Sequence, residues 1–333
     1  MTRPTRLEQA VVRFNTVQQA RFFVESRGQS FQDYELESAN YSKSRDDLQK
    51  FIPRDASIQE IDRDFLPNYV FGPNDLVITL GQDGLVVNTA KYLNGQPIIA
   101  VNPDPDRFDG VLMPFQTKDL PRVVEAVAEN RFRTRKVTMA RADMNDGQSL
   151  LAFNDFFIGT ETQTSARYTI HYGKESEQHI SSGIIVSTPA GSTGWLSSFF
   201  NMNRGINAFL QGGEGASAFK PPAKDLKVVP PVKKPGGKKG KKSGAEARAF
   251  RMDWEERRLV FMVREPFMSK WSQAQIVAGE IPEGNTLTLE SHMPEGGVLF
   301  SDGMTRDFLE FNSGATAKIK IAAQTAELVT EIV

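Results

Sequence analysis

The stretch LVITLGQDGLVVNTAKYLNGQPIIAVN, residues 76–102, contains two apolar runs with a glycine-bounded turn and a helical pattern between them. Residues 76–80 and 97–102 have the length and continuous apolar character of strands that are buried on both faces. Residues 86–93 have helical spacing. Because strand, turn, helix and strand in this order form a βαβ unit, the sequence predicts a parallel sheet in the first part of the chain.

Helical patterns flank this unit. TRLE at residues 5–8 has the pattern of a capping box, with a capping Thr and a Glu that reaches back three positions later, and it predicts a helix to about Ser26. A second helix is predicted for residues 30–51, where Pro53 ends it. One more helix is predicted for residues 119–131.

From about Arg135 the hydrophobic pattern changes mostly to a period of two, and few helical patterns intervene. This change predicts a β-rich second domain. The predicted strands are residues 136–143, 166–172, 183–186, 259–263 and 285–289.

Residues 219–244, FKPPAKDLKVVPPVKKPGGKKGKKSG, are dominated by Lys, Pro and Gly and have no periodicity. The composition is typical of a flexible insertion. One interpretation is a solvated loop, and the other is a basic patch for a nucleic acid or an acidic partner.

Composition limits the classes of protein that remain. The 333 residues carry a formal net charge of −1, and their number suggests two domains or one large one. The absence of Cys excludes disulfides, thiolate metal sites and a Cys nucleophile, and it is consistent with a reducing cytoplasm. The three His have no metal-ligand spacing, and no apolar run approaches the roughly 18 residues of a membrane span. We therefore expect a cytoplasmic protein with no membrane partner and no secretory signal.

GQDGL, residues 81–85, closes the first buried strand and opens the helix. Ligands collect at the carboxyl ends of strands in such sheets, where glycines let a backbone approach phosphates and a helix N-terminus favours anions. A carboxylate at Asp83 would repel a phosphate unless a metal or a proton transfer is involved, and it could accept the proton of an attacking hydroxyl. Taken alone, the motif is also an ordinary Asp-Gly turn.

Three further motifs place polar residues next to apolar runs. Asn154 and Asp155 interrupt the run AFNDFFIG and need partners if buried, either nucleoside groups or local backbone groups at a strand end or bulge. STPAGSTGW, residues 187–195, suits a loop that lets a polar ligand approach its backbone, or a Ser/Thr turn that caps a short helix. SDG in LFSDGMTRDF, residues 299–308, is predicted to be a turn between two strands.

In this order, GxDG after a buried strand, Asn plus an acidic residue, STPxGST and SDG resemble the motifs of the NAD kinase family. The resemblance covers roughly residues 76–330 and includes VNPDPDRFDGVL at residues 101–112. SSGIIVSTPAGSTGW, together with NDFFIG and VREPF, is more similar to the mitochondrial-type branch than to the ordinary bacterial one.

The chain also departs from the family pattern. Gln82 and Leu85 replace a Gly and the Thr of the family's GGDGT, and Asp155 replaces a Glu. Ser182 stands where an Asp is usual, and Trp195, after Gly194, replaces a Tyr but keeps a ring for stacking. The strand with which the family usually begins is short or missing before TRPTRLE.

The resemblance implies a Rossmann-like α/β domain over residues 1–140 and a β-sandwich-like, NAD-binding domain over residues 141–333, with a C-terminal end that can return to the first domain. It implies transfer of the γ-phosphoryl group of ATP to the 2′-hydroxyl of the adenosine ribose of NAD, with Asp83 as the general base and Mg²⁺ bridging phosphate oxygens without assigned protein ligands. The residues expected to bind phosphate or nucleotide are Gly81, Gly84, Asn102, Ser187, Thr188, Gly191 and Ser192. Those expected to bind NAD are Asn154, Asp155, Thr193 and Trp195.

The expected partners are NAD, ATP and further copies of the chain, in a homodimer or a higher homo-oligomer. Three alternatives stay open. The first is a related kinase that acts on a sugar or lipid hydroxyl, and the second, motivated by Gln82 and Leu85, is a catalytically impaired NAD(P)-binding protein. The third is a nucleic-acid binder that uses the Lys-rich insertion, although a nucleic acid is not the expected partner.

Overall fold

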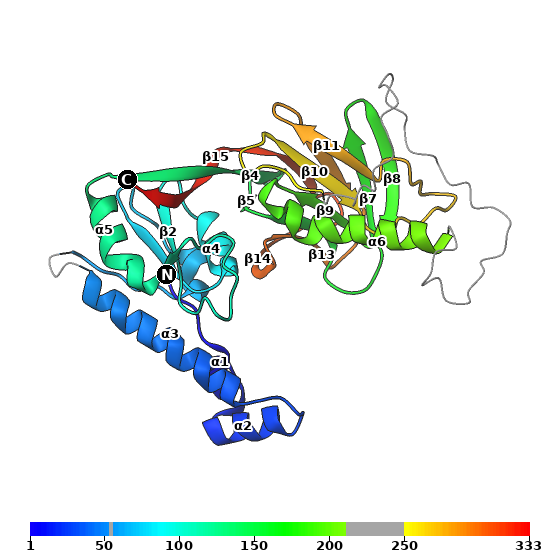
Figure 1. The fold of residues 1–333 in the computed structure, drawn as a ribbon. Coiled ribbons are helices and arrows are strands. Elements are labelled where there is room, and N and C mark those ends of the chain that lie inside the picture. The colour runs from blue at the N-terminus through cyan, green and yellow to red at the C-terminus, as the bar shows by residue number, and fades with distance from the viewer. Residues whose placement is uncertain (53–55, 211–249) are drawn as a thin grey trace, which may run out of the picture.

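The computed structural model describes residues 1–52, 56–210 and 250–333, and Figure 1 shows their arrangement. The Lys/Pro-rich insertion expected at residues 219–244 lies outside the described residues. The described strands form a nine-stranded sheet and a six-stranded sheet.

The βαβ unit predicted from residues 76–102 is confirmed. Strands β1 (Val77–Leu80) and β2 (Pro97–Asn102) pair in parallel, α4 (Asp83–Ala90) connects them, and the short β3 (Phe115–Gln116) lies parallel to β2. Helices α3 (Gln32–Phe51) and α5 (Leu120–Ala128) contribute to a second apolar cluster with both strands, distinct from the cluster that contains α4. The parallel sheet is therefore covered on both faces, as its apolar sequence requires.

The helix predicted from Thr5 to Ser26 is two helices, α1 (Arg6–Phe14) and α2 (Val17–Glu25). The capping box at Thr5 is present, but Asn15 adopts a left-handed φ of 67° and Thr16 caps a new helix. Asn tolerates this conformation better than most residues, so the chain can turn there. Both helices project from the sheet in Figure 1.

Residues 1–3 run alongside β1. The Met1 amino group donates a hydrogen bond to the Ile78 carbonyl at 2.7 Å, and the Leu80 N–H donates to the Met1 carbonyl at 3.0 Å. From the sequence, the first strand of the family is expected to be short or missing. Residues 1–3 lie next to β1 and form only a short extended segment there.

Two long antiparallel strands, β4 (Phe132–Met144) and β15 (Thr316–Ile332), run from one half of the molecule to the other (Figure 1). One end of β15 pairs in parallel with β2, with Leu328 opposite Ile98, and the other pairs with β12 (Leu287–Ser291). Residue 140, at which the resemblance implies a domain boundary, lies inside β4. The two halves of the molecule therefore share a continuous sheet.

The second half is a sandwich of antiparallel strands, and it completes the predicted α/β plus β-sandwich fold. Apolar side chains from both sheets form one buried cluster between them. The larger sheet also contains β5 (Ser149–Ala152), β7 (Ala166–Tyr172) and β8 (Glu175–Ser181). The smaller sheet has the order β11 (Ala278–Pro282), β10 (Arg258–Val263), β9 (Ile184–Ser187), β6 (Asp155–Thr160), β13 (Gly297–Ser301) and β14 (Met304–Glu310).

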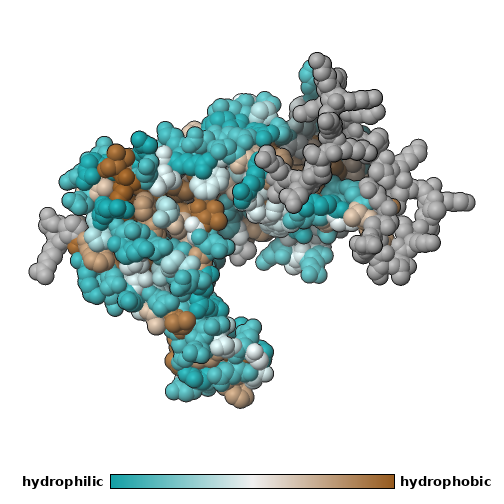
Figure 2. Space-filling view, viewed as in Figure 1, coloured by the Kyte–Doolittle hydropathy of each residue, from teal (hydrophilic) through white to brown (hydrophobic). Residues whose placement is uncertain are grey.

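Three short 3₁₀ segments and one longer helix complete the fold: η1 (Arg63–Asn68), η2 (Thr117–Asp119), η3 (Ala190–Thr193) and α6 (Trp195–Leu210). The face of the molecule in Figure 2 is mostly polar, with small separate apolar areas. Among the helices that the structure describes, none has the length and apolar character to cross a bilayer.

Candidate functional site

Asp83 is the first residue of α4 and lies at the carboxyl end of β1. Its two carboxylate oxygens accept hydrogen bonds from the N–H groups of Val111, at 3.2 Å, and Leu112, at 2.9 Å. These donors belong to the segment that follows β2. The helix N-terminus and the two N–H groups favour a negative charge here, and a carboxylate has further acceptor positions that stay free.

The two glycines of the turn differ in their surroundings. Gly81 is buried, and a Cβ added to it would lie 3.0 Å from a methyl carbon of Leu85, whereas a Cβ at Gly84 would meet no atom within 4 Å. The Leu at position 85 therefore packs against the turn. Asn102 is buried and holds the loop after β2, because its amide donates to the Phe108 carbonyl at 2.9 Å and accepts from the Asp104 N–H at 3.0 Å.

Asp302 fixes the backbone of the Asn154–Asp155 motif. Its carboxylate accepts hydrogen bonds from the N–H groups of Phe153 at 2.9 Å, Asn154 at 2.6 Å and Asp155 at 3.3 Å. Asp302 has a φ of 55°, and its own N–H donates to the Asp155 carbonyl at 3.0 Å. The predicted SDG turn between β13 and β14 is confirmed, but no pattern in the sequence indicates that it also orients this motif.

The carboxyl groups of the buried Asp155 and the half-buried Asp302 thus lie close together. Burial and, to a smaller extent, the nearby charge of Asp302 together raise the pKa of Asp155 to about 7. Burial also raises the pKa of Asp302 to about 6, although its three backbone donors and the Lys91 charge oppose the shift. The site therefore contains a carboxyl group that changes its charge near neutral pH.

The STPAGST loop is tied directly to the Asn154 segment. The Thr188 N–H donates to the Asn154 carbonyl at 2.8 Å, the Thr188 hydroxyl donates to the Phe153 carbonyl, and Ser187 lies opposite Asp155 in the paired strands. A Cβ on Gly191 would overlap the Asn154 carbonyl oxygen. Gly191 is therefore needed because only Gly permits this approach.

The hydroxyls of this loop fall into two groups. Ser187 and Ser192 are fully buried, and they bond to the Thr188 carbonyl at 3.0 Å and the Met252 N–H at 3.1 Å. Thr193 and Trp195 are exposed. The buried hydroxyls shape the loop, while Thr193 and Trp195 are open to a ligand.

Trp195 is part of an aromatic cluster. Its ring stacks on Phe157 with centroids 5.7 Å apart and an interplanar angle of 11°. The Arg264 guanidinium carbon lies 5.4 Å from the centroid of Trp195 and 5.7 Å from that of Phe157. The ring predicted to stack on a ligand thus already packs against one protein ring.

A buried cation connects α4 to the SDG hairpin. The Lys91 side chain is 1% exposed, and its ammonium group lies 2.8 Å from both the Ser301 hydroxyl and an Asp307 carboxylate oxygen. The Tyr92 hydroxyl donates to the same Asp307 oxygen. The contact between Lys91 and the SDG hairpin was not predicted from the sequence. The one local indication of it was a Lys at the end of an apolar helix.

These contacts bring the four motifs together around α4. Its residues Val86 and Val87 belong to one apolar cluster with Phe153 and Ala190, the neighbours of Asn154 and Gly191. The helix that begins at the GQDG turn therefore shares an apolar cluster with the segments of two other motifs, and Lys91 at its end bonds to the SDG hairpin. A glycine turn and a helix N-terminus at the edge of a parallel sheet favour the binding of a phosphate group.

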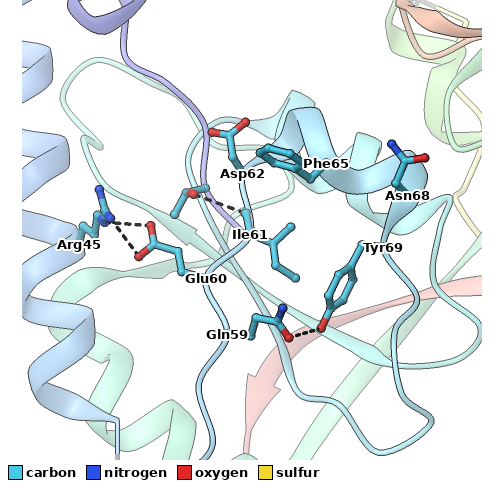
Figure 3. A pocket seen from close by; sticks show the side chains of 9 residues that line it. Arg45, Gln59, Glu60, Ile61, Asp62, Phe65, Asn68 and Tyr69 are labelled. Carbon is cyan, nitrogen blue, oxygen red and sulfur yellow. Dashed lines mark hydrogen bonds and ion pairs between the residues drawn. The ribbon is translucent and has the colours of Figure 1, made fainter.

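A separate cavity of about 610 Å³ lies between α3, η1 and Thr2 (Figure 3). It is lined by Glu60, Asp62 and Tyr69 among others, and by none of the residues predicted for the site. Within the described ranges, no group of three or more His, Asp or Glu residues is arranged to hold a metal ion.

No family model matches the chain. It is 28% identical over 142 residues to an NAD kinase of Campylobacter jejuni, which is 39% of this chain and 49% of that one. It is 29% identical over 144 residues to NAD kinase 1 of Trichormus variabilis, or 37% and 45% of the two chains. Over 217 residues it is 26% identical to an NAD kinase of Hyphomonas neptunium, or 60% and 80%. The chain spans about half the length of the first two relatives.

The fold is also similar to that of a solved structure, yeast NADH kinase complexed with NADH. The TM-score is 0.56 at 13% sequence identity, over 88% of this chain and 80% of that one. Part of the chain is therefore similar in sequence to NAD kinases, and its fold is similar to that of an NADH kinase.

Proposed function

We propose that this chain is an NAD kinase, which transfers the γ-phosphoryl group of ATP to the 2′-hydroxyl of the adenosine ribose of NAD and gives NADP. The observation that carries the proposal is the placement of Asp83. Its carboxylate stands at the edge of the parallel sheet and is fixed by two backbone N–H groups. It lies on the helix whose Val86 and Val87 share an apolar cluster with Phe153 and Ala190.

In this proposal Asp83 accepts the proton of the attacking hydroxyl. Gly81 and Gly84 give the donor phosphates access to the backbone at the start of α4. Asn154 and Asp155 hold the ribose and base of NAD, and Thr193 and Trp195 offer the open hydroxyl and ring of the loop. Phosphoryl transfer depends mainly on position and charge, and the tight connections among these segments supply the position.

The family implies Mg²⁺, and the residues at the turn fit it. Mg²⁺ usually keeps several waters and is bound through one or two carboxylates together with substrate phosphates. Asp83 keeps free acceptor positions at the start of α4, whereas the oxygens of Asp302 are occupied by backbone donors. When bound with ATP, the ion would offset the negative charge that the phosphates bring next to Asp83.

One assay tests the proposal: purified protein, ATP, Mg²⁺ and NAD, with NADP detected by a coupled dehydrogenase. We expect Asp83→Asn to lower kcat by about 10²–10⁴-fold, the usual contribution of a general base, with the Kd for NAD nearly unchanged. Asp109→Asn is the matched control, because Asp109 is an exposed carboxylate in the loop that contacts Asp83.

Activity that persists in Asp83→Asn would exclude Asp83 as the base. Phosphorylation of a sugar or a lipid, with none of NAD, would favour the related kinase instead. NAD binding with no ATP-dependent formation of NADP would identify an impaired NAD(P)-binding protein.

We also propose that the chain forms a homodimer. Light scattering of the purified chain measures its mass in solution and checks this.

A further inference from the structure

We infer that Arg3 binds the terminal phosphates of the nucleoside triphosphate at the GQDG turn. This inference rests on the proposed kinase function and adds a phosphate-binding residue that none of the four motifs contains.

The position of Arg3 follows from the pairing of residues 1–3 with β1. Because the Leu80 N–H bonds to the Met1 carbonyl, Arg3 reaches the carboxyl end of β1 next to Gly81. A Cβ added to Gly81 would lie 3.5 Å from Arg3 Cδ and 3.6 Å from Arg3 Nε. Arg3 therefore packs directly against the turn, at the edge of the sheet where ligands of such folds collect.

The Arg3 side chain is held in place before any ligand arrives. Its backbone N–H donates to the Tyr41 hydroxyl at 3.0 Å, and that hydroxyl donates to the Leu80 carbonyl at 3.0 Å. The guanidinium carbon lies 5.8 Å from the ring centroid of Tyr41 and 5.9 Å from that of Phe108. The side chain is 10% exposed, so little conformational freedom would be lost when it binds an anion.

The charge around Arg3 is not balanced. The Glu37 carboxylate accepts hydrogen bonds from both Arg3, at 2.9 Å, and Arg6, so two guanidinium groups share one carboxylate. Burial disfavours the charge of Glu37, but the hydrogen bonds from Arg6 and Arg3 outweigh it and hold the pKa of Glu37 below its ordinary value. This cluster keeps a surplus positive charge next to the phosphate turn.

Arg3 also has an unused donor. Within the part of the chain that the structure describes, its Nε is buried and has no hydrogen-bond partner. A buried donor without a partner costs free energy, which a phosphate oxygen would recover. By contrast, Arg107 at the same edge is paired with Asp104 at 3.2 Å. Position, charge and the unpaired donor all favour Arg3 as the residue that meets the incoming phosphates.

Direct binding to the full chain tests the inference without the kinase reaction. Isothermal titration with ATP–Mg²⁺, with inorganic tripolyphosphate and with NAD compares the wild type with Arg3→Met and Arg3→Lys. We expect Arg3→Met to raise the Kd for ATP and for tripolyphosphate by about tenfold or more, the size of a charge-assisted hydrogen bond. Arg3→Lys should lose less, and the Kd for NAD should stay unchanged.

Arg6→Met is the matched control. It removes the other guanidinium from Glu37, but Arg6 lies over the ring of Tyr34, at 4.6 Å, and is 42% exposed. We expect it to weaken tripolyphosphate binding less than Arg3→Met does, because it lowers the charge of the cluster but leaves in place the guanidinium that packs against the turn. Thermal unfolding verifies that each variant is folded. If Arg3→Met does not fold, the Kd values of Arg3→Lys and Arg3→Gln for tripolyphosphate are compared instead, because only Arg3→Lys keeps the positive charge.

Equal losses in Arg3→Met and Arg6→Met, or no loss in either, would overturn the inference. A loss confined to NAD would assign Arg3 to the pyrophosphate of the acceptor, which also overturns it. A wild type that binds tripolyphosphate through Arg3 but forms no NADP would refute the proposed function and leave Arg3 as a phosphate ligand.

Discussion

Asp155 is a buried carboxyl group whose pKa, raised to about 7 by burial and by Asp302, makes its charge depend on pH near neutrality. An ionised carboxylate accepts a stronger hydrogen bond from a ribose hydroxyl than a protonated one does. We therefore expect the KM for NAD to rise by up to about tenfold as the pH falls from 8 to 6, since the ionised fraction falls by about that factor. Initial rates at several pH values measure this.

The control for this pH effect is Asp155→Asn, which cannot ionise. Its KM for NAD should be higher than that of the wild type at pH 8 and nearly constant across the range. A KM that rises equally in wild type and variant would show that another group is responsible.

The same two carboxyl groups make folding depend on pH. Their pKa values in the folded protein, about 7 for Asp155 and about 6 for Asp302, lie above the ordinary value of about 3.9. Between these limits the folded state holds protons that the unfolded state has released, so stability is lost as the pH rises and gained as it falls. We expect Asp155→Asn to be more stable than the wild type by about 1 kcal/mol or more at pH 7.5, with a smaller difference at pH 5. Urea unfolding at both pH values checks this, and a constant difference would contradict it.

The motif residues Asp83, Asn154, Asp155 and Gly191 could be recognised from the sequence, because each lies in a short pattern of distinctive composition. The role of Asp302 could not, since it depends on a hairpin about 150 residues further along the chain reaching the Phe153 backbone. A role for Arg3 could not be predicted from the sequence either, because Arg3 comes close to Gly81 only when residues 1–3 lie along β1.

At the scale of elements, α4 joins the two halves of the site through the buried ion pair of Lys91 and Asp307. Lys91→Met leaves the Asp307 carboxylate, 11% exposed, without its cation. We expect it to lower the free energy of unfolding by about 3–5 kcal/mol, the usual effect of breaking a buried pair on one side. Urea unfolding measures this loss.

The double variant Lys91→Met/Asp307→Leu should recover much of that loss, because it removes both charges together. Lys50→Met is the control, since Lys50 pairs with Asp47 at the surface with a side chain 69% exposed, and it should change stability by less than about 1 kcal/mol. If the double variant were no more stable than Lys91→Met, the ion pair would not be the cause of the loss.

Hydrophobic patterns predicted most of the helices but only part of the described strands, with shifts of a few residues at their ends. The prediction of a single first helix was wrong. Leu7, Ala10 and Phe14 have helical spacing up to Asn15, but hydrophobic spacing does not indicate where a residue such as Asn15 adopts a left-handed conformation. The long β15 was also not predicted, since its AAQTAE segment in the middle lacks the alternation of a strand.

At the scale of the whole molecule, β4 and β15 run through both the parallel sheet and the sandwich, so neither half has a complete sheet without them. Leu328, 2% exposed, packs near β2 in one half, and Ile319, fully buried, packs in the sandwich of the other. Since both residues lie on one strand, disrupting either end should destabilise both halves. We expect one cooperative unfolding transition, with equal midpoints by far-UV circular dichroism and by tryptophan fluorescence.

Leu328→Ala and Ile319→Ala should each lower the free energy of unfolding by about 2–5 kcal/mol, as is usual when a large buried side chain is truncated. Each variant should move both signals together and leave the urea dependence unchanged, because the same surface is exposed in one step. Two midpoints, with Leu328→Ala shifting one of them and Ile319→Ala the other, would show that the halves unfold separately. The shared strands would then connect the two halves without fixing their relative position, and the geometry of the proposed site would have to depend on the Lys91–Asp307 pair.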